Sequence, residues 1–247
     1  MPHVSAARRV RARTARGHTL LEGVLFLLIA GMLVQAVLFG QNLIHDARVR
    51  SVIAQQDAAE SAVLAFQDRY RALPGDYAEA SLHIGCVPGP CLDGDGNGRV
   101  EHGNADALRE DILAWTHLAA GGFLENEFSM QDPGVTAPSN ENTPASVFGT
   151  YMHLASDDLW GSSLNDAQRV NIKTGNMIPV EILEQVDSKT DDGRPGSGRF
   201  QFSTYAAAGV APAAGGSEGA CTDLDSVDAA WDVRSGQGNC GAVTLLR

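Results

Sequence analysis

The sequence predicts an α+β fold in which a long N-terminal helix packs on a globular head with a small antiparallel sheet. Three observations support this. An uncharged apolar stretch over residues 23–45 is long enough to span a membrane as a helix. A stretch rich in helix-forming residues follows it without an intervening proline. Beyond Pro74 and Gly75, helix-like and strand-like segments alternate with loops rich in Gly and Pro.

The charge distribution divides the chain into a basic N-terminal end and an acidic body. Of the 18 basic residues, five arginines lie in the first 17 positions, where there is no acidic residue. The remainder therefore carries 13 basic against 30 acidic residues. An acidic body does not neutralise phosphates, so we expect no nucleic-acid partner. The basic flank should stay in the cytoplasm by the positive-inside rule, which places the head on the other side of the membrane.

The apolar stretch has two ordinary interpretations. A cleaved secretory signal needs small residues at its cleavage site, and bulky Leu38 and Phe39 lie where that site would fall. A plain signal anchor is the second interpretation, with Glu22 at the membrane interface. Neither explains the arrangement of residues directly before the apolar run.

That arrangement, RGHTLLE over residues 16–22, resembles the prepilin leader of type IV pilins and type II secretion pseudopilins. The resemblance implies that an inner-membrane prepilin peptidase cuts after Gly17 and that the new N-terminal amine of His18 is methylated. Glu22 is then the fifth residue of the mature chain. The sequence departs from the family pattern at His18, where Phe or Met is usual, and at Gly23, where a large aliphatic residue is common.

The resemblance also implies an organisation and a role. Residues 1–17 would be the leader, residues 18–45 the transmembrane and assembly helix, and residues 46–247 a periplasmic or extracellular head. The chain would cross the inner membrane once and then enter a cell-surface or periplasmic fibre. Its partners would be other pilin subunits, the peptidase and the assembly machinery of the inner membrane. A carboxylate inside an apolar bundle is costly unless it is paired, so Glu22 would pair with the amine of a neighbouring subunit and set the register.

The first predicted element is a helix over residues 18–72. Its first half is apolar all round, and its second half has one apolar stripe, as expected for packing under a head. Pro74 and Gly75 end it. Two helices broken near residues 40–45 are the alternative. The stripe consists of Val49, Val52, Ile53, Ala59, Val63, Phe66 and Tyr70.

The head is predicted to contain helices and strands of modest length. Helices are expected over residues 104–122 and 178–193, and strands over residues 146–156, 199–210 and 241–247. Residues 131–147 are rich in Pro, Ser, Asn and Thr and are expected to form a loop. The stretches ALPGDYAEA, WTHLAAGGFLENEF and VDSKTDDGRPGSGRF are similar to segments of a group of large pilin-like proteins.

The four cysteines fall in two close pairs, Cys86 with Cys91 and Cys221 with Cys240. An even number in an exported chain indicates disulfides, and three connectivities are open. Pairing within each close pair is the one we favour. No C-x-x-C motif occurs, which weakens a zinc interpretation.

The stretch DGDGNGRVEHGN over residues 93–104 opens like an EF-hand calcium loop. It ends differently, because Asn104 stands where that loop has a bidentate Glu, so weak calcium affinity is expected. Asp106 or Glu110 is the alternative ligand for this last position. An acidic, glycine-rich turn without metal is the alternative. The candidate calcium ligands are Asp93, Asp95, Asn97, Arg99 through its carbonyl, Glu101 and Asn104.

Other polar residues are expected to have structural roles. Asp187, Asp191 and Asp192 form an acidic stretch that favours a helix-end turn over a metal site. His117 lies on an apolar helix face and is expected to be a core histidine with satisfied ring nitrogens. The chain lacks the common catalytic motifs, so no enzyme activity is expected.

The sequence therefore predicts a structural subunit of a type IV pilus-like fibre, most consistent with a minor pilin. A type II secretion pseudopilin is the alternative within the family. An alternative of another class is a signal-anchored periplasmic domain that binds calcium and a ligand.

Overall fold

The computed structural model describes residues 19–102, 108–161, 168–215, 220–223 and 229–246. The chain forms two compact units, Met1–Ile44 and His45–Arg247. Helix α1 (Leu20–Tyr70) is one uninterrupted helix of 51 residues, so the alternative with a break near residues 40–45 is wrong. The helix gives way to a turn at Arg71, whose φ of 55° lies in the left-handed region, and Pro74 follows.

The part of α1 within the second unit, residues 45–70, has the apolar stripe that its sequence predicts. Val49, Val52, Ala59, Val63 and Phe66 are buried along it. Ile53 and Tyr70 are partly buried and pack against the same side chains. A 3.6-residue period places these positions on one face, so this part of α1 is held mainly by apolar packing.

The head contains a four-stranded antiparallel sheet in the order β1-β2-β4-β3. Its strands are β1 (His153–Asp157), β2 (Arg169–Lys173), β3 (Phe200–Phe202) and β4 (Ala242–Leu245). His153 pairs with Lys173, and Asn171 pairs with Leu245. The last strand of the chain therefore lies inside the sheet, between β2 and β3.

Three helices and one 3₁₀ turn complete the described head: α2 (Ala80–His83), α3 (Glu110–Ala120), α4 (Val180–Thr190) and η1 (Val233–Ser235). The two longer ones match the predicted helices, although α3 begins later because Leu108 and Arg109 are not helical. The three predicted strands are present as β1, β3 and β4, shorter than expected. Strand β2 was not predicted.

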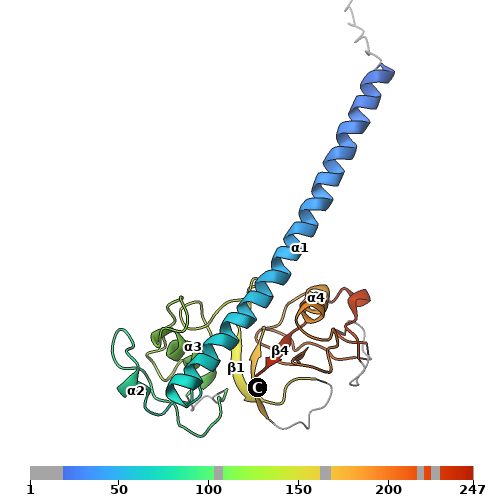
Figure 1. Ribbon diagram of the computed structural model, residues 1–247. Coiled ribbons are helices and arrows are strands. Elements are labelled where there is room, and N and C mark those ends of the chain that lie inside the picture. The colour runs from blue at the N-terminus through green and yellow to red at the C-terminus, as the bar shows by residue number, and fades with distance from the viewer. Residues whose placement is uncertain (1–18, 103–107, 162–167, 216–219, 224–228, 247) are drawn as a thin grey trace, which may run out of the picture. The chain divides into compact units, whose positions relative to one another are not determined.

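Four apolar clusters form the core of the described head, and the two largest involve α1. Figure 1 shows α1 running between α3 and the sheet. In the first, Val63 and Phe66 contact the group that contains Trp115 of α3 and Ile172 of β2. In the second, Val49 and Val52 pack with α4, β3 and the Cys221–Cys240 pair. Residues 45–70 of α1 thus join the helical part of the head to the sheet, as the α+β prediction required.

Candidate functional site

The first turn of α1 presents Glu22 at the solvent-exposed start of the helix. The Glu22 backbone N–H donates to Thr19 Oγ1 at 3.3 Å. Thr19 and Glu22 stand three residues apart, which is the spacing of a capping box. Glu22 is therefore suited to stabilise the start of the helix as well as to carry a charge there. Gly17 and His18 lie outside the described residues.

The following turns of α1 expose an apolar surface on all sides. An 18-residue window of this helix has a mean hydropathy of 2.4, and none of that window is buried. By length and composition it is the one membrane-span candidate among the described residues. Leu21, Phe26, Leu33 and Phe39 are each more than half exposed. This surface is compatible with a single-pass membrane anchor.

The loop that resembles an EF-hand, residues 93–104, is held in its described part mainly by hydrogen bonds from its own backbone N–H groups to its Asp and Asn side chains. Asp95 Oδ1 accepts from the Asn97 N–H at 3.0 Å, and Asn97 Oδ1 accepts from the Arg99 N–H at 2.9 Å. Such Asx turns explain why Asp and Asn alternate here. Asp93 instead faces α2, where its two oxygens accept from Ser81 N and Ser81 Oγ at 2.6 and 2.8 Å.

The predicted ligand set is thus only partly brought together in the described residues. Asp95 and Asn97 pair side by side, Asp93 is engaged elsewhere, and Arg99 and Glu101 are exposed. Asn104 lies outside the described residues. Calcium binding by this loop remains a prediction.

A different carboxylate group forms beside this loop. Asp76, Asp95 and Glu110 each place an oxygen within 4.8 Å of the others. The Gly98 N–H donates to Asp76 Oδ2 at 2.9 Å, and the N–H groups of Asp95 and Glu101 donate to the two oxygens of Glu110 at 3.1 and 3.2 Å. Burial raises the pKa of Glu110 to about 7, and it raises the pKa of Asp76 as well.

Asp76 was not predicted as a ligand of the loop, and Glu110 was predicted only as an alternative for its last position. Asp76 lies in the turn after α1, and Glu110 opens α3. The sequence offers one weak signal for Asp76: a carboxylate follows the Pro-Gly pair that ends a helix. No spacing rule links it to Glu110, because the contact depends on how the turn packs against α3.

A second buried network surrounds Asp111 and Asp157. Arg109 Nε and Nη2 donate to the two oxygens of Asp111 at 2.7 and 2.6 Å, and Lys173 Nζ donates to Asp157 Oδ1 at 2.9 Å. His102 lies between the carboxylates, with Nδ1 at 3.0 Å from Asp111 and Nε2 at 3.3 Å from Asp157. His153 Nδ1 also approaches Asp111 Oδ2, at 3.1 Å.

The pKa shifts in this network follow from its pairing. Burial alone would raise the pKa of Asp111, but hydrogen bonds from Arg109 and the two histidines hold it well below its usual range. Burial alone would lower the pKa of His102, but its bonds to Asp111 and Asp157 raise it. Positive and negative groups alternate, so the network joins the loop, α3, β1 and β2 without a net excess of buried charge.

His117 satisfies both of its ring nitrogens inside the core, as predicted. The Gly75 N–H donates to Nδ1 at 3.0 Å, and Nε2 donates to Leu92 O at 2.9 Å. The ring also lies parallel to that of Phe66, with centroids 6.1 Å apart. This neutral histidine attaches the turn after α1 and the cysteine loop to α3.

The second acidic stretch spans the last turn of α4 and the turn that follows it. Asp187 accepts from Trp231 Nε1 at 2.7 Å and from the Gly193 N–H at 3.2 Å. Asp191 accepts from the N–H of Phe200, and Asp192 from the N–H of Arg194, both at 2.9 Å. These bonds agree with the predicted helix-end turn.

The cysteines pair within each close pair, Cys86 with Cys91 and Cys221 with Cys240. This is the favoured one of the three connectivities that the sequence allows. The second bridge is fully buried and joins the segment before η1 to the residue that leads into β4.

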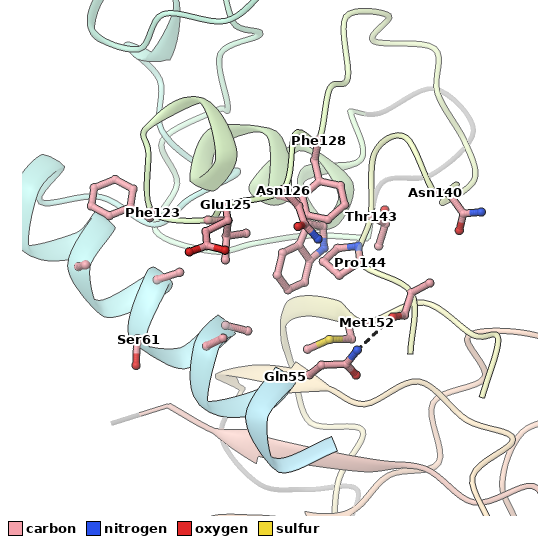
Figure 2. Close-up of a pocket in the computed structure, with 17 residues that line it drawn as sticks. Gln55, Ser61, Phe123, Glu125, Asn126, Phe128, Asn140, Thr143, Pro144 and Met152 are labelled. Atoms are coloured by element: carbon pink, nitrogen blue, oxygen red, sulfur yellow. Dashed lines mark hydrogen bonds between the residues drawn. The ribbon is translucent and has the colours of Figure 1, made fainter. Parts of the chain in front are cut away.

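A pocket of about 780 Å³ lies between α1 and the loops at residues 123–128 and 140–145 (Figure 2). Alanines of α1 form one wall, and Phe128 and Met152 lie across from them. Gln55 Nε2 donates to Ala145 O at 3.3 Å at one end. Glu125 is the only titratable side chain among the described lining residues, so the pocket is lined mainly by uncharged side chains and offers no catalytic group beyond this carboxylate.

No protein-family model matches the chain, and comparisons with curated proteins and with solved structures find no significant match.

Proposed function

We propose that the chain is a structural subunit, a minor pilin, of a type IV pilus-like fibre. The observation that supports this role is the division of α1 into two kinds of surface. The turns that follow Glu22 expose an uncharged apolar surface on all sides, whereas residues 45–70 carry one buried stripe that packs in the head. An apolar surface of that length is favourable in lipid or against other such helices.

In this proposal the chain is made as a precursor that crosses the inner membrane once, with its head in the periplasm. The prepilin peptidase cuts after Gly17, and the amine of His18 becomes the new N-terminus. Residues 18–45 then leave the lipid and pack against the same segment of other subunits. A type II secretion pseudopilin would use the same steps in a shorter periplasmic fibre.

Glu22 has a specific role in this assembly. An unpaired carboxylate within packed apolar helices is costly, and pairing with the positive amine of a neighbouring subunit removes that cost. A subunit placed in the wrong axial register would leave both charges unpaired. The carboxylate therefore selects one register.

Processing distinguishes a pilin precursor from a signal-anchored domain. Gly17→Ile should leave the chain at its full precursor mass and keep it out of the fibre. Gly31→Ala is the matched control, because a Cβ at Gly31 meets no atom within 4 Å and the position is far from the cut. Intact-mass spectrometry of the membrane fraction, with and without the peptidase, measures both. A wild-type chain that is uncut, or cut elsewhere, would contradict the proposal.

Glu22→Gln tests the charge separately from the helix cap. Glutamine suits the third position of a capping box, so α1 should still form. We expect normal cleavage and membrane insertion but loss from the fibre fraction, measured by shearing and immunoblotting. Thr19→Ala is the complementary control, because it removes the capping hydroxyl and keeps the charge. Normal incorporation of Glu22→Gln together with loss of Thr19→Ala would assign Glu22 to the cap alone.

A further inference from the structure

Three carboxylates from three separate segments meet in the head. Asp76 comes from the turn after α1, Asp95 from the loop that follows the first disulfide, and Glu110 from the first turn of α3. Their oxygens lie within 4.8 Å of one another. At this separation, three ionised carboxylates repel one another strongly unless a cation lies among them.

Close backbone packing produces this meeting. A Cβ added to Gly94 would lie 2.2 Å from Gly75 O, and one added to Gly75 would lie 2.4 Å from Glu110 O. Gly75 also has a φ of 92°, which favours glycine. Only residues without a side chain allow the loop, the turn and α3 to approach so closely, and this approach places Asp95 beside the other two carboxylates.

Among the described residues, these carboxylates lack the cationic partners that other buried carboxylates of the head have. Asp76 and Glu110 are each only 4% exposed. In the ranges that the structure describes, no Lys, Arg or His forms an ion pair with either of them or with Asp95. The buried Asp111 and Asp157, by contrast, pair with Arg109 and Lys173.

One oxygen in the group points specifically to a ligand. Asp76 Oδ1 is buried and has no hydrogen-bond partner among the described residues, while Oδ2 accepts from the Gly98 N–H. A buried acceptor without a partner costs about 1–3 kcal/mol, and more when it is charged. The carboxylate of Asp187 is equally buried, but each of its oxygens accepts a hydrogen bond.

We propose that Asp76, Asp95 and Glu110 bind one calcium ion. Carboxylate oxygens are the ligands of hard divalent cations, and calcium accepts irregular geometry with backbone carbonyls or water completing its shell. Magnesium demands a near-ideal octahedron, which segments of a turn, a loop and a helix start do not readily supply. Zinc prefers His and Cys ligands, which this group does not include. Asp95 is exposed and gives the ion its route of entry.

The ion would join the turn after α1 to the loop and to α3. This ligand set shares Asp95 with the EF-hand pattern of the loop, but replaces Asp93 by two carboxylates from outside the loop. The site does not depend on the proposed fibre role, because binding can be measured on the isolated subunit.

The test uses the full-length chain in detergent, treated with EDTA and desalted. Calcium at a hundredfold excess over Kd should raise Tm by about 5–10 °C, and magnesium at equal ionic strength should raise it much less. Isothermal titration calorimetry should give one site per chain. Asp76→Asn should abolish both effects while raising the Tm of the ion-free protein, because the amide keeps the acceptor for Gly98 and removes one repelling charge.

Asp93→Asn is the matched control. It removes one acidic charge from the same loop, and Asp93 is occupied by Ser81 rather than by the carboxylate group. Its calcium response should equal that of the wild type. Glu110→Gln provides a second variant of the site if Asp76→Asn does not fold.

Several results would overturn the proposal. These are the absence of calorimetric binding to the wild type, an equal response to both ions, or an unchanged calcium response in Asp76→Asn or Glu110→Gln. Loss of the response in Asp93→Asn would assign the ion to the EF-hand positions of the loop instead. None of these results bears on cleavage after Gly17 or on fibre assembly, so the two proposals fail separately.

Discussion

At the scale of single residues, the stability of the head depends on buried polar side chains whose hydrogen bonds can all form in only one protonation state. His117 shows this most simply, because it accepts from Gly75 through one ring nitrogen and donates to Leu92 through the other. A second proton would occupy Nδ1 and break the bond from Gly75. Burial, which disfavours the charged ring, lowers the pKa of His117 to about 4.

This shift predicts a loss of stability in mild acid. The unfolded chain binds a proton at this histidine near its usual pKa of 6.5, whereas the folded chain does so only near 4. Between these values the unfolded state holds more protons, so the free energy of unfolding falls as the pH falls, by up to about 3 kcal/mol for this residue. His102 acts in the opposite direction, because its pKa is raised.

His117→Gln isolates this contribution. We expect the variant to be less stable at neutral pH but to lose less stability than the wild type between pH 6.5 and pH 4. Urea midpoints measured across that range by tryptophan fluorescence give the comparison. His83→Gln is the control, since it makes the same replacement at an exposed histidine of the head. Parallel profiles for wild type and His117→Gln would contradict this role.

At the scale of secondary-structure elements, α1 is one helix whose two parts have different surfaces. Residues 45–70 need a well-packed apolar stripe, and Phe66 on that stripe is fully buried against Tyr70, Tyr77, His117 and Phe123. Residues 20–44 need only an apolar surface, and Leu33 there is 63% exposed. The same helix therefore packs in the head in one part and, in the other, exposes an apolar surface that is compatible with a membrane anchor.

Truncating a side chain in each part should have different effects. Phe66→Ala should lower the free energy of unfolding of the head by about 3–5 kcal/mol, because it removes buried contacts and leaves a cavity. Leu33→Ala should change it by less than about 0.5 kcal/mol. Denaturation in detergent, followed by near-UV circular dichroism, measures both variants. Equal losses would show that residues 20–44 also pack in the folded head.

At the scale of the whole molecule, the head is closed by contacts between distant parts of the chain. Strand β4, at the C-terminus, lies between β2 and β3, and Thr244 Oγ1 donates to Gln56 of α1 at 2.9 Å. The Cys221–Cys240 bridge holds the chain just before this strand, and Cys240 and Ile178 exchange backbone hydrogen bonds. The bridge therefore fixes the strand that completes the sheet.

Removing each disulfide should show that the Cys221–Cys240 bridge contributes more to the stability of the head than the Cys86–Cys91 bridge. Cys221→Ser with Cys240→Ser opens a 19-residue separation and should cost about 3 kcal/mol by loop entropy. Cys86→Ser with Cys91→Ser opens a separation of five and should cost about 2 kcal/mol. Urea denaturation of the two double variants, compared with the wild type, tests the order. The prediction holds only if the free energy of unfolding falls more in Cys221→Ser with Cys240→Ser than in Cys86→Ser with Cys91→Ser.

The local features of this protein follow from its sequence alone. The type of α1, its buried stripe and the turn at Pro74 and Gly75 depend on residues close together in the chain. The cysteine pairing does not belong with them, because the sequence left three connectivities open. Helix α4 and strand β4 also carry their own signals, in a 3.6-residue period and in an apolar run. Strand β2 does not, because its sequence RVNIK begins with an exposed arginine and carries a lysine whose burial depends on Asp157.

Only the tertiary structure decided which polar groups meet. The sequence placed the candidate calcium ligands within one loop, mainly at alternate positions, which share a direction. In the folded head Asp93 turns to Ser81, and Asp95 lies beside Asp76 and Glu110 instead. The network of Asp111 likewise depends on β1 lying next to α3. Such contacts join residues far apart in the chain, and close packing at glycines such as Gly75 and Gly94 determines them, so no local pattern encodes them.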